Sequence, residues 1–435
     1  MRNKVCLIGT GYVGMASGLG LAELGWNVIG YDILPDRIAG LRAGITPYQE
    51  DGINELLQKH LASQRISFVD SFETAIAQAG IILIAVGTPA GADGAADLSG
   101  LHAVVDAILA SDVPASTVVV IRSTVPPGTS DEVARALRDR CPVLYAPEFL
   151  REGSAVPDFL NPDRIVIGGD DYAARIHYAK LFERLERPIL FTSRVNAELI
   201  KGWSNAFLAM KISFANEVAN FCAEVGADSD EVLRGIGYDK RIGEAFLAPG
   251  IGFGGPCFEK DVKSMVNAAA KVRTGGEILS SVLRVNDVQP KRIVDTLAGE
   301  LGSLEGAHIG VWGLAFKAGT SDVRDSLAMR VIADLIARGA SVAAYDPAVR
   351  SVPIEECAIV NSAIEAASCD ALLILTEWPE FKDVSLKELS SRIKQKLVVD
   401  GRNLLDPERV VAAGLKYNGV GRSVPQPVRE LASVG

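Results

Sequence analysis

A cysteine stands in a glycine-rich loop with charged residues directly behind it. The stretch GFGGPCFEKD covers residues 252–261 and places Cys257 three residues before Lys260 and four before Asp261. The following segment, EKDVKSMVNAAAKV, is typical of a helix, so the helix dipole and Lys260 both favour the thiolate at Cys257. We therefore predict a nucleophilic thiol here. The competing interpretation, a small buried apolar residue, is the one we favour for the other five cysteines, at positions 6, 141, 222, 357 and 369.

The segment GTGYVG, residues 9–14, has the spacing of a phosphate-binding turn. It directly follows the apolar run KVCLI and opens the helical segment GMASGLGLAELG. Gly9 permits a tight turn, Gly11 lets the backbone approach a pyrophosphate, and Gly14 allows close packing of helix on strand. Together with Tyr12 and Val13, these glycines predict a dinucleotide site.

An acidic residue at the end of the second predicted strand bears on the choice of dinucleotide. Asp32 follows Gly14 by 18 residues, where a carboxylate accepts hydrogen bonds from the adenosine ribose and repels a 2′-phosphate. This position favours NAD as the cofactor. Arg37 leaves NADP open, because an arginine there either stacks on adenine or pairs with a 2′-phosphate.

Two threonines follow later apolar strands. Thr88 lies in VGTP and Thr124 in STVPPG, at strand ends that face the cofactor crevice of such a sheet. Either threonine is suited to hydrogen-bond the nicotinamide end of the cofactor or a catalytic water. Threonine is also an ordinary turn residue, and position alone favours neither interpretation.

The elements that position these residues form a regular series along the chain. Apolar runs alternate with helical segments up to about residue 193, a rhythm typical of a parallel sheet. A long helical stretch then runs to Gly226, a suitable C-cap, and strand-like runs return with HIGVWGLAF at residue 308. We predict an α/β protein with two Rossmann-like, doubly wound parallel-sheet domains, 1–193 and 301–435, joined by a helical central domain, 194–300. Because GVWGLAF stands where a glycine motif would, we expect no second NAD in the last domain.

The charge of the chain disfavours several classes of partner. With 54 acidic against 44 basic residues the net charge is −10, so neither nucleic acid nor an anionic membrane is an expected partner. We recognise no signal peptide or membrane span in the first residues and expect a cytoplasmic protein with reduced thiols. The Cys/His spacing predicts no metal site. The amphipathic central helices predict a homodimer, or else bury their apolar faces against the flanking domains.

Longer motifs carry a resemblance to a known family: APEFLREG at 146–153, AELIKGWSNAFLAMKISFANE at 197–217, GFGGPCFEKDV from residue 252, and GLAFKAGTSDVRDS at 313–326. Together they resemble the UDP-glucose/GDP-mannose dehydrogenase family along essentially the whole chain, and most closely its members that act on UDP-glucose. The resemblance implies a two-step oxidation of a sugar C6 alcohol to a carboxylate with two NAD and one water. Cys257 would add to the intermediate aldehyde, and the thiohemiacetal would become a thioester that water hydrolyses.

The resemblance also implies catalytic roles. Thr124 and Asp261 match residues around a catalytic water, and Glu148 matches a catalytic glutamate. Lys201 and Asn205, four residues apart on one predicted helix face, match a pair that stabilises the developing alkoxide or oxyanion. The four histidines lie outside every motif, which disfavours an imidazole base. Water activation by Asp261 or by Glu148 stays open.

Binding residues follow from the same resemblance, which assigns the last domain to the UDP-sugar. Arg241 matches an arginine that the family can donate across a dimer interface. The expected substrate contacts are Glu148, Phe149, Leu150, Arg151, Glu152, Lys201, Asn205, Arg241, Phe246, Leu247, Ala248, Pro249, Gly250, Gly254 and Lys317. The expected cofactor contacts are Gly9, Gly11, Tyr12, Val13, Gly14, Asp32, Arg37, Thr88, Thr124, Glu152, Lys260 and Arg324.

Three residues depart from the family pattern, and other functions stay open. Ala146, Pro256 and Glu259 replace the family's asparagine, serine and proline, and the first two lie near the chemistry. Glu259 adds a negative charge that we expect to offset Lys260 in part. GDP-mannose and a UDP-N-acetylhexosamine are alternative substrates. A two-electron hydroxyacid dehydrogenase would have no use for Cys257, and a non-catalytic NAD sensor would not require the catalytic set.

Overall fold

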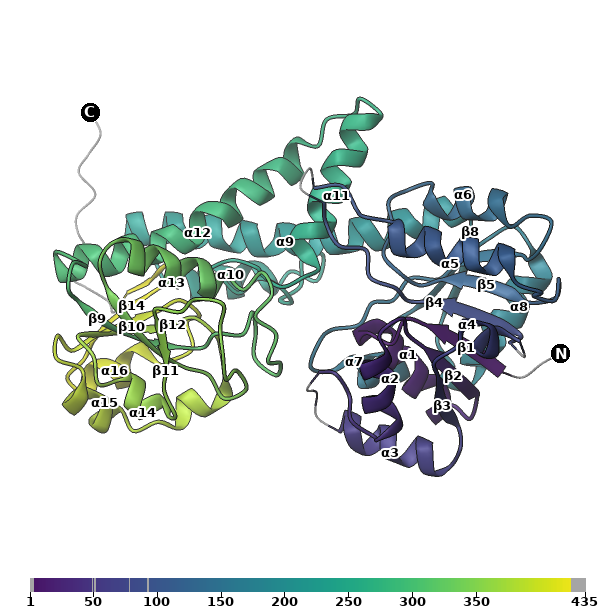
Figure 1. The fold of residues 1–435 in the computed structure, drawn as a ribbon. Helices are drawn as coiled ribbons and strands as arrows, with labels where there is room; N and C mark the ends of the chain where they lie inside the picture. Colours follow the sequence, from purple (N-terminus) through teal and green to yellow (C-terminus); the bar gives the residue numbers. More distant parts are fainter. Residues whose placement is uncertain (1–3, 49, 51, 78, 92–93, 424–435) are drawn as a thin grey trace. The chain divides into compact units, whose positions relative to one another are not determined.

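The computed structural model describes residues 4–48, 50, 52–77, 79–91 and 94–423. The chain forms two compact units: the first comprises Met1–Ser204 and Lys263–Thr274, the second Asn205–Val262 and Gly275–Gly435. Each unit is built on one sheet with helices on both faces (Figure 1). Two helices, α9 (Arg194–Val225) and α11 (Phe258–Lys271), have residues in both units.

The first unit is built on an eight-stranded sheet of order β3-β2-β1-β4-β5-β6-β7-β8. Neighbouring strands are parallel except β6 and β7. The first six strands have the order of dinucleotide-binding sheets, which reverses between β1 and β4. The strands are β1 (Lys4–Ile8), β2 (Asn27–Tyr31), β3 (Ile66–Val69), β4 (Ile81–Ile84), β5 (Val118–Ile121), β6 (Val143–Tyr145), β7 (Ile165–Gly168) and β8 (Ile189–Thr192).

Apolar side chains cover both faces of this sheet. Strands β4 and β5, with sequences IILI and VVVI, are buried along their whole length, as parallel strands between two helix layers should be. One face packs against α1 (Tyr12–Glu23), α2 (Pro35–Arg42), α3 (Ile53–Ala62), α7 (Ala155–Leu160), α8 (Tyr172–Ala179) and η1 (Lys180–Leu185). The other face packs against α4 (Phe72–Ile76), α5 (Ser99–Ala110), α6 (Thr129–Ala136) and the first turns of α9.

The second unit repeats this plan on a seven-stranded sheet of order β11-β10-β9-β12-β13-β14-β15, in which only β15 is antiparallel. The strands are β9 (His308–Trp312), β10 (Ser341–Tyr345), β11 (Cys357–Ile359), β12 (Ala371–Ile374), β13 (Leu397–Asp400), β14 (Lys416–Gly419) and β15 (Arg422–Ser423). One face packs against α12 (Glu277–Leu301), α13 (Leu327–Ala337) and α9. The other packs against α14 (Ala363–Ala366), η2 (Pro379–Asp383), α15 (Leu386–Arg392) and α16 (Pro407–Ala412), while α10 (Ser229–Gly237) follows α9 in the chain.

The two sheets repeat one local geometry after their first strands. Gly9 and Gly313, each one residue past the strand, have φ of +90° and +94°. In both units, the residue after this glycine donates its backbone N–H to an aspartate that directly follows the second strand. Thr10 N lies 2.8 Å from Asp32 Oδ2, and Leu314 N lies 2.8 Å from Asp346 Oδ2. Asp346 is fully buried and also accepts a hydrogen bond from an indole N–H, whereas Asp32 keeps an exposed fraction of 7%. The carboxylate of the second unit therefore has a structural role.

The predicted fold class is confirmed: two parallel sheets of α/β type, with a helical region between them in the sequence. Helix α9 ends at Val225, and Gly226 has φ of +74°, as the C-cap prediction requires. Several short strands were not predicted, among them β3, β6, β8, β11 and β14. The division into three domains stays a prediction. No helix in the described part of the chain combines the length and the apolarity that a membrane span requires.

Candidate active site

In the turn after β1, the backbone leaves no room for a Cβ atom at two of the glycines. A Cβ on Gly9 would lie 2.7 Å from Ala85 O, and one on Gly14 would lie 2.0 Å from Gly9 O. At Gly11 nothing lies within 4 Å of the Cβ position, so the turn is open there. Helix α1 begins at the next residue, Tyr12, and the first N–H groups of a helix are available to an anion. These residues fit the pyrophosphate of a dinucleotide.

Asp32 has several hydrogen-bond donors in its own unit. Its Oδ2 accepts from Thr10 N at 2.8 Å, from Thr10 Oγ1 at 2.9 Å and from Arg37 Nη1 at 2.9 Å. Its Oδ1 accepts from Leu34 N at 3.1 Å. Burial raises the pKa of Asp32, but the hydrogen bonds from Thr10, Leu34 and Arg37 outweigh burial and hold the pKa below its usual value. Asp32 is therefore an anion beside the turn, and Arg37 forms an ion pair with it.

Tyr12 connects this turn to the segment after β6. Its hydroxyl donates to a carboxylate oxygen of Glu50 and lies 3.0 Å from Arg151 O. The other carboxylate oxygen of Glu50 accepts from Ala155 N at 2.6 Å. Burial and the neighbouring Glu50 carboxylate raise the pKa of Tyr12, so its phenol stays protonated. The predicted cofactor turn and the predicted sugar-binding segment 148–152 are thereby held together.

The carboxyl ends of β4 and β5 bring the two predicted threonines together. Thr88 Oγ1 donates to Thr124 O at 2.7 Å, and Ser123 Oγ donates to Val86 O at 2.6 Å. Both hydrogen bonds join the loop after β4 to the loop after β5. Thr88 thus has a structural contact that supports the interpretation as a turn residue, and it holds Thr124 at the sheet edge where the cofactor turn also lies.

Glu148 and Lys201 form a buried ion pair in the first unit. Lys201 Nζ donates to Glu148 Oε1 at 2.9 Å, and the two residues are 4% and 8% exposed, respectively. Glu148 Oε2 accepts from Leu150 N at 2.6 Å. Burial raises the pKa of Glu148, but Lys201, the Leu150 N–H and the Arg122 charge outweigh burial and hold the pKa below its usual value. The pair places an ionised carboxylate and an ammonium just past the end of β6.

Cys257 lies in the second unit, at the start of the predicted catalytic segment. It is exposed immediately before α11, whereas the other five cysteines, all in the described part of the chain, are buried. Asp261 N donates to Cys257 O at 2.9 Å within the first turn. Asp261 is 3% exposed and accepts from Lys260 Nζ and from Asn205 Nδ2, each at 2.6 Å. The structure therefore brings the predicted Asn205 of α9 and Lys260 of α11 to the carboxylate of Asp261, in the first turn of the helix that Cys257 precedes.

The departure at Glu259 has a local explanation. Its carboxylate lies 2.7 Å from Arg330 Nη2 on α13. The charge of Glu259 is thus balanced by Arg330, and that of Lys260 by Asp261 at 2.6 Å. The expectation that Glu259 offsets Lys260 in part stays a prediction. Glu259 also joins the start of α11 to α13.

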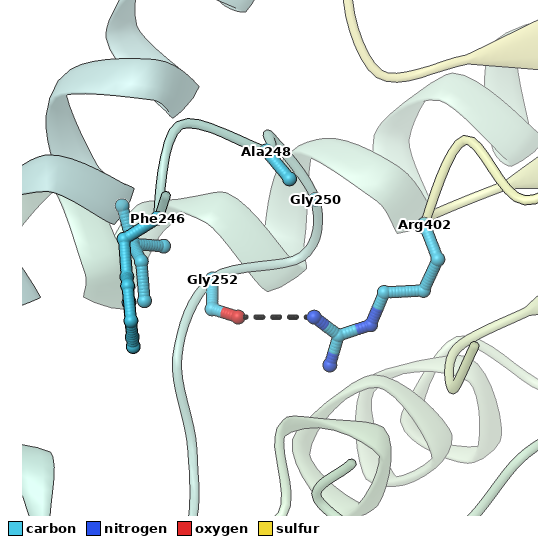
Figure 2. A pocket seen from close by; sticks show the side chains of 6 residues that line it. Phe246, Ala248, Gly250, Gly252 and Arg402 are labelled. Carbon is cyan, nitrogen blue, oxygen red and sulfur yellow. Dashed lines mark hydrogen bonds between the residues drawn. The ribbon is translucent and has the colours of Figure 1, made fainter. Parts of the chain in front are cut away.

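A pocket of about 270 Å³ lies in the second unit beside the loop that leads to Cys257 (Figure 2). Arg402 Nη1 lies 3.4 Å from Gly252 O across this pocket, and Arg402 Nε donates to Leu375 O at 2.8 Å. Apolar walls with one guanidinium suit a flat ring attached to a phosphate. The lining residues are Ile212, Phe246, Ala248, Gly250, Gly252 and Arg402.

Arg402 was not among the predicted site residues. This residue follows β13 and lies 3.4 Å from Phe316 O, in the loop after β9, as well as near the end of β12. It therefore stands where the strand order of the second sheet reverses, the position at which open α/β sheets bind ligands. A signal was present in the sequence, because an arginine follows the predicted strand LVVDGR in an acidic chain.

Other predicted contact residues have partners within their own unit. Arg151 pairs with Asp158 at 2.6 Å, Arg241 with Asp239 at 2.6 Å and Arg324 with Asp322 at 2.5 Å. Each of these guanidinium side chains is at least 65% exposed, so an anionic ligand can compete with the carboxylate. Lys317 Nζ lies 5.8 Å from the Phe316 ring centroid, and Leu247 is buried. The ligand contacts of these residues stay predictions.

Family models match three consecutive parts of the chain. The NAD binding domain of the UDP-glucose/GDP-mannose dehydrogenase family matches residues 3–186, its central domain 195–288 and its UDP binding domain 310–407. The UDP-glucose 6-dehydrogenase TuaD of Bacillus subtilis is 40% identical over 432 residues, which cover 96% of this chain and 93% of that protein. The UDP-glucose 6-dehydrogenase of Rhizobium meliloti is 42% identical over 439 residues, which cover 96% and 99%.

Solved structures agree with these matches. A UDP-glucose dehydrogenase from the hyperthermophilic archaeon Pyrobaculum islandicum has a TM-score of 0.89 at 38% identity and covers 97% of this chain and 98% of its own. A UDP-D-ManNAc dehydrogenase from Pyrococcus horikoshii has a TM-score of 0.87 at 27% identity, with 96% and 99% covered. The glycine turn, the cysteine loop and the second sheet fall within the matched domains in the expected order. The chain therefore belongs to the UDP-glucose/GDP-mannose dehydrogenase family, and its first unit contains an NAD-binding domain.

Proposed function

We propose that the protein is an NAD-dependent UDP-glucose 6-dehydrogenase that oxidises the C6 alcohol of UDP-glucose to the carboxylate of UDP-glucuronate. The observation that carries this proposal is Cys257, an exposed thiol before a helix, five residues after a glycine that lines the pocket of the second unit. An oxidation that stopped at the aldehyde would need no thiol. Full-length relatives at 40% and 42% identity bear the name of this activity.

The cofactor assignment rests on the first turn and on Asp32. When bound, NAD would supply the hydride acceptor for both oxidations. Gly9, Gly11 and the start of α1 would hold its pyrophosphate, and Asp32 would accept hydrogen bonds from its adenosine ribose. Because the pKa of Asp32 is lowered, the residue is ionised at neutral pH and would repel the extra phosphate of NADP.

The protein side of the first oxidation is the removal of a proton from the C6 hydroxyl. Lys201 supplies positive charge that stabilises the oxygen as its negative charge develops, and Asn205 supplies a hydrogen-bond donor. Two carboxylates are candidates for the base that receives the proton, Asp261 through a water and Glu148. Glu148 is already ionised beside Lys201, as a base must be.

Cys257 takes part in the second oxidation. Its thiolate adds to the aldehyde carbon, and the resulting thiohemiacetal loses a second hydride and becomes a thioester. Water then adds to the thioester carbon, the C–S bond breaks, and the thiolate is restored. In total, one alcohol and one water give one carboxylate, two hydrides and three protons, so atoms and charge balance.

The pocket of the second unit would bind the nucleotide part of the substrate. Phe246 and Ile212 offer apolar surfaces to a base, and Arg402 offers charge to a phosphate. A comparison of kcat/KM for UDP-glucose, GDP-mannose and UDP-N-acetylmannosamine tests the substrate assignment. We expect the highest value for UDP-glucose. A higher value for either of the other two sugars would move the assignment to that sugar.

We also propose that the protein is a homodimer through α9. This helix exposes Phe207, Phe214, Phe221 and Val225 by 58%, 49%, 68% and 45%, at spacings of seven, seven and four residues that place them on one stripe. An exposed apolar stripe of this kind is typical of an interface. Analytical ultracentrifugation should show a dimer that Phe214→Glu together with Phe221→Glu converts to monomer. A monomeric wild-type protein would contradict the proposal.

A further inference from the structure

Three buried carboxamides hold the loop that leads to Cys257. Asn216 Oδ1, on α9, accepts from Gly250 N at 2.7 Å, and Gln289 Nε2, on α12, donates to Gly250 O at 3.1 Å. Asn286, also on α12, accepts from Phe253 N at 2.7 Å and donates to Phe253 O at 2.9 Å. The three side chains, here called the amide clamp, belong to residues that are at most 2% exposed. Each of them contacts backbone, so the clamp fixes the path of the chain whatever the loop side chains are.

The clamped loop has little conformational preference of its own. Residues 250–255 read GIGFGG, and glycine has wide backbone freedom that folding has to restrict. Gly252 adopts φ of +107°, and a Cβ there would lie 2.5 Å from Asn286 Oδ1. Asn286 supplies Phe253 with the donor and the acceptor that a neighbouring strand would otherwise supply. The single conformation of the loop is therefore imposed by the clamp.

The clamp acts on two parts of the site at once. Gly250 and Gly252 line the pocket, and Phe253 precedes Cys257 by four residues. The Phe253 ring packs edge-on against Phe258, the first residue of α11, with ring centroids 6.0 Å apart. A change at Asn286 would move the pocket wall and the approach to the thiol together.

Helix α9 carries both a member of the amide clamp, Asn216, and the hydrogen-bond partner of Asp261, Asn205. Asn216 lies on this helix 11 residues after Asn205, whose amide donates to Asp261 at 2.6 Å. Eleven residues are close to three helical turns, so the two asparagines lie on one face about 16 Å apart along the axis. One rigid element thus positions both Asp261 and the pocket loop.

We propose that Asn286, supported by Gln289 and Asn216, is a positioning residue for the reaction. It holds the loop 250–253 in one conformation before substrate binds, so that the position of Cys257 relative to the nucleotide pocket is fixed. Preorganisation of this kind contributes to both binding and rate, because a displacement of about 1 Å in a reacting group costs about a hundredfold. The identity of the sugar in this inference rests on the proposed function, whereas the ordering of the loop does not.

The test compares Asn286→Ala with Ser213→Ala. Ser213 Oγ donates to Val282 O at 2.9 Å and so joins the same two helices by a hydrogen bond in which the loop takes no part. Val282 O keeps its acceptor role within α12 in that control variant. Four quantities are measured for each protein: amide hydrogen exchange of peptides within 246–258, alkylation of Cys257 by iodoacetamide with and without UDP, the affinity for NAD, and kcat and KM.

For Asn286→Ala we expect exchange within 246–258 to be faster by about tenfold and UDP protection of Cys257 to be lost. We expect kcat/KM for UDP-glucose to fall about a hundredfold, with kcat reduced as well as KM raised. NAD affinity should stay within about twofold, because the glycine turn and Asp32, which would hold most of the dinucleotide, lie in the other unit. Ser213→Ala should match the wild-type protein within about twofold throughout.

Wild-type exchange and wild-type UDP protection in Asn286→Ala would overturn the inference, and so would equal effects of Ser213→Ala. If Asn286→Ala does not fold, Gln289→Ala takes its place, since it removes one bond to Gly250. A weaker version of the same pattern is then expected, and wild-type exchange in that variant would overturn the inference. A wild-type protein that does not oxidise UDP-glucose would refute the proposed function, while the exchange data would still decide whether Asn286 orders the loop.

Discussion

Replacing Lys201 by methionine tests the buried ion pair just past β6. Lys201 Nζ lies 2.9 Å from Glu148 Oε1, and the two residues are 4% and 8% exposed. Methionine keeps the length of the side chain but removes the ammonium, so Glu148 is left as a buried charge without its partner. Removing one partner of a buried pair costs about 3–5 kcal/mol, and we expect the free energy of unfolding of the first unit to fall by that amount at neutral pH.

The pH dependence of this loss follows from the pKa of Glu148. In the wild-type protein this pKa is lowered, so Glu148 stabilises the fold above the usual carboxyl pKa and loses that contribution as the pH falls through the lowered pKa. In Lys201→Met we expect burial to raise the pKa of Glu148 above its usual value. The deficit of the variant should then be complete at neutral pH and should shrink as the pH falls through that raised pKa.

Urea unfolding of the wild-type protein and of Lys201→Met at about pH 8 and about pH 5.5 measures both effects. The double variant Glu148→Gln with Lys201→Met is the control, because it has no buried ion and should recover most of the lost stability. A deficit below about 1 kcal/mol, a deficit that does not change with pH, or a double variant no more stable than the single one would refute the reasoning.

Two further predictions concern aspartates at strand ends, Asp32 directly after β2 and Asp400 as the last residue of β13. Asp32→Ser should weaken NAD binding about tenfold, and it should narrow the preference for NAD over NADP because Arg37 is released from its ion pair. Calorimetric titration with both dinucleotides measures the two affinities. An unchanged ratio of the affinities for NAD and NADP would contradict the prediction. Asp400 is fully buried, and burial raises its pKa. The folded state therefore binds the proton of the Asp400 carboxyl more tightly than the unfolded chain does. As a result, the folded state gains stability as the pH falls from neutral through the raised pKa. Asp400→Asn should remove that gain, and unfolding curves that keep the wild-type pH dependence in the variant would show that another group causes it.

The roles of residues that depend on neighbours in the sequence could be predicted from the sequence. The turn from Gly9 to Gly14 was recognisable because a strand-like run directly precedes it and a helical segment directly follows it. The buried runs of β4 and β5 are long enough to identify a covered parallel sheet. Cys257 was recognisable because its glycines, its charges and the helix after it are all adjacent in the chain.

Residues that act through distant contacts were not predictable from one sequence. Strand β8 is partly exposed at the sheet edge, so its hydrophobic signal is weak. Asn286 resembles any polar residue in a helix, since its role depends on Phe253, 33 residues away in the chain. The pairing of Glu259 with Arg330 spans 71 residues, and no local pattern indicates it.

The most direct test of the proposed function is the number of NADH molecules formed per UDP-glucose. A limiting, known amount of UDP-glucose is converted to completion with excess NAD, and the NADH absorbance is compared between the wild-type protein and Cys257→Ser. The thioester route predicts two NADH per sugar for the wild-type protein, because four electrons leave the alcohol, and a loss of at least about a thousandfold in the rate for Cys257→Ser. One NADH per sugar from the wild-type protein, or an unimpaired Cys257→Ser variant, would contradict it.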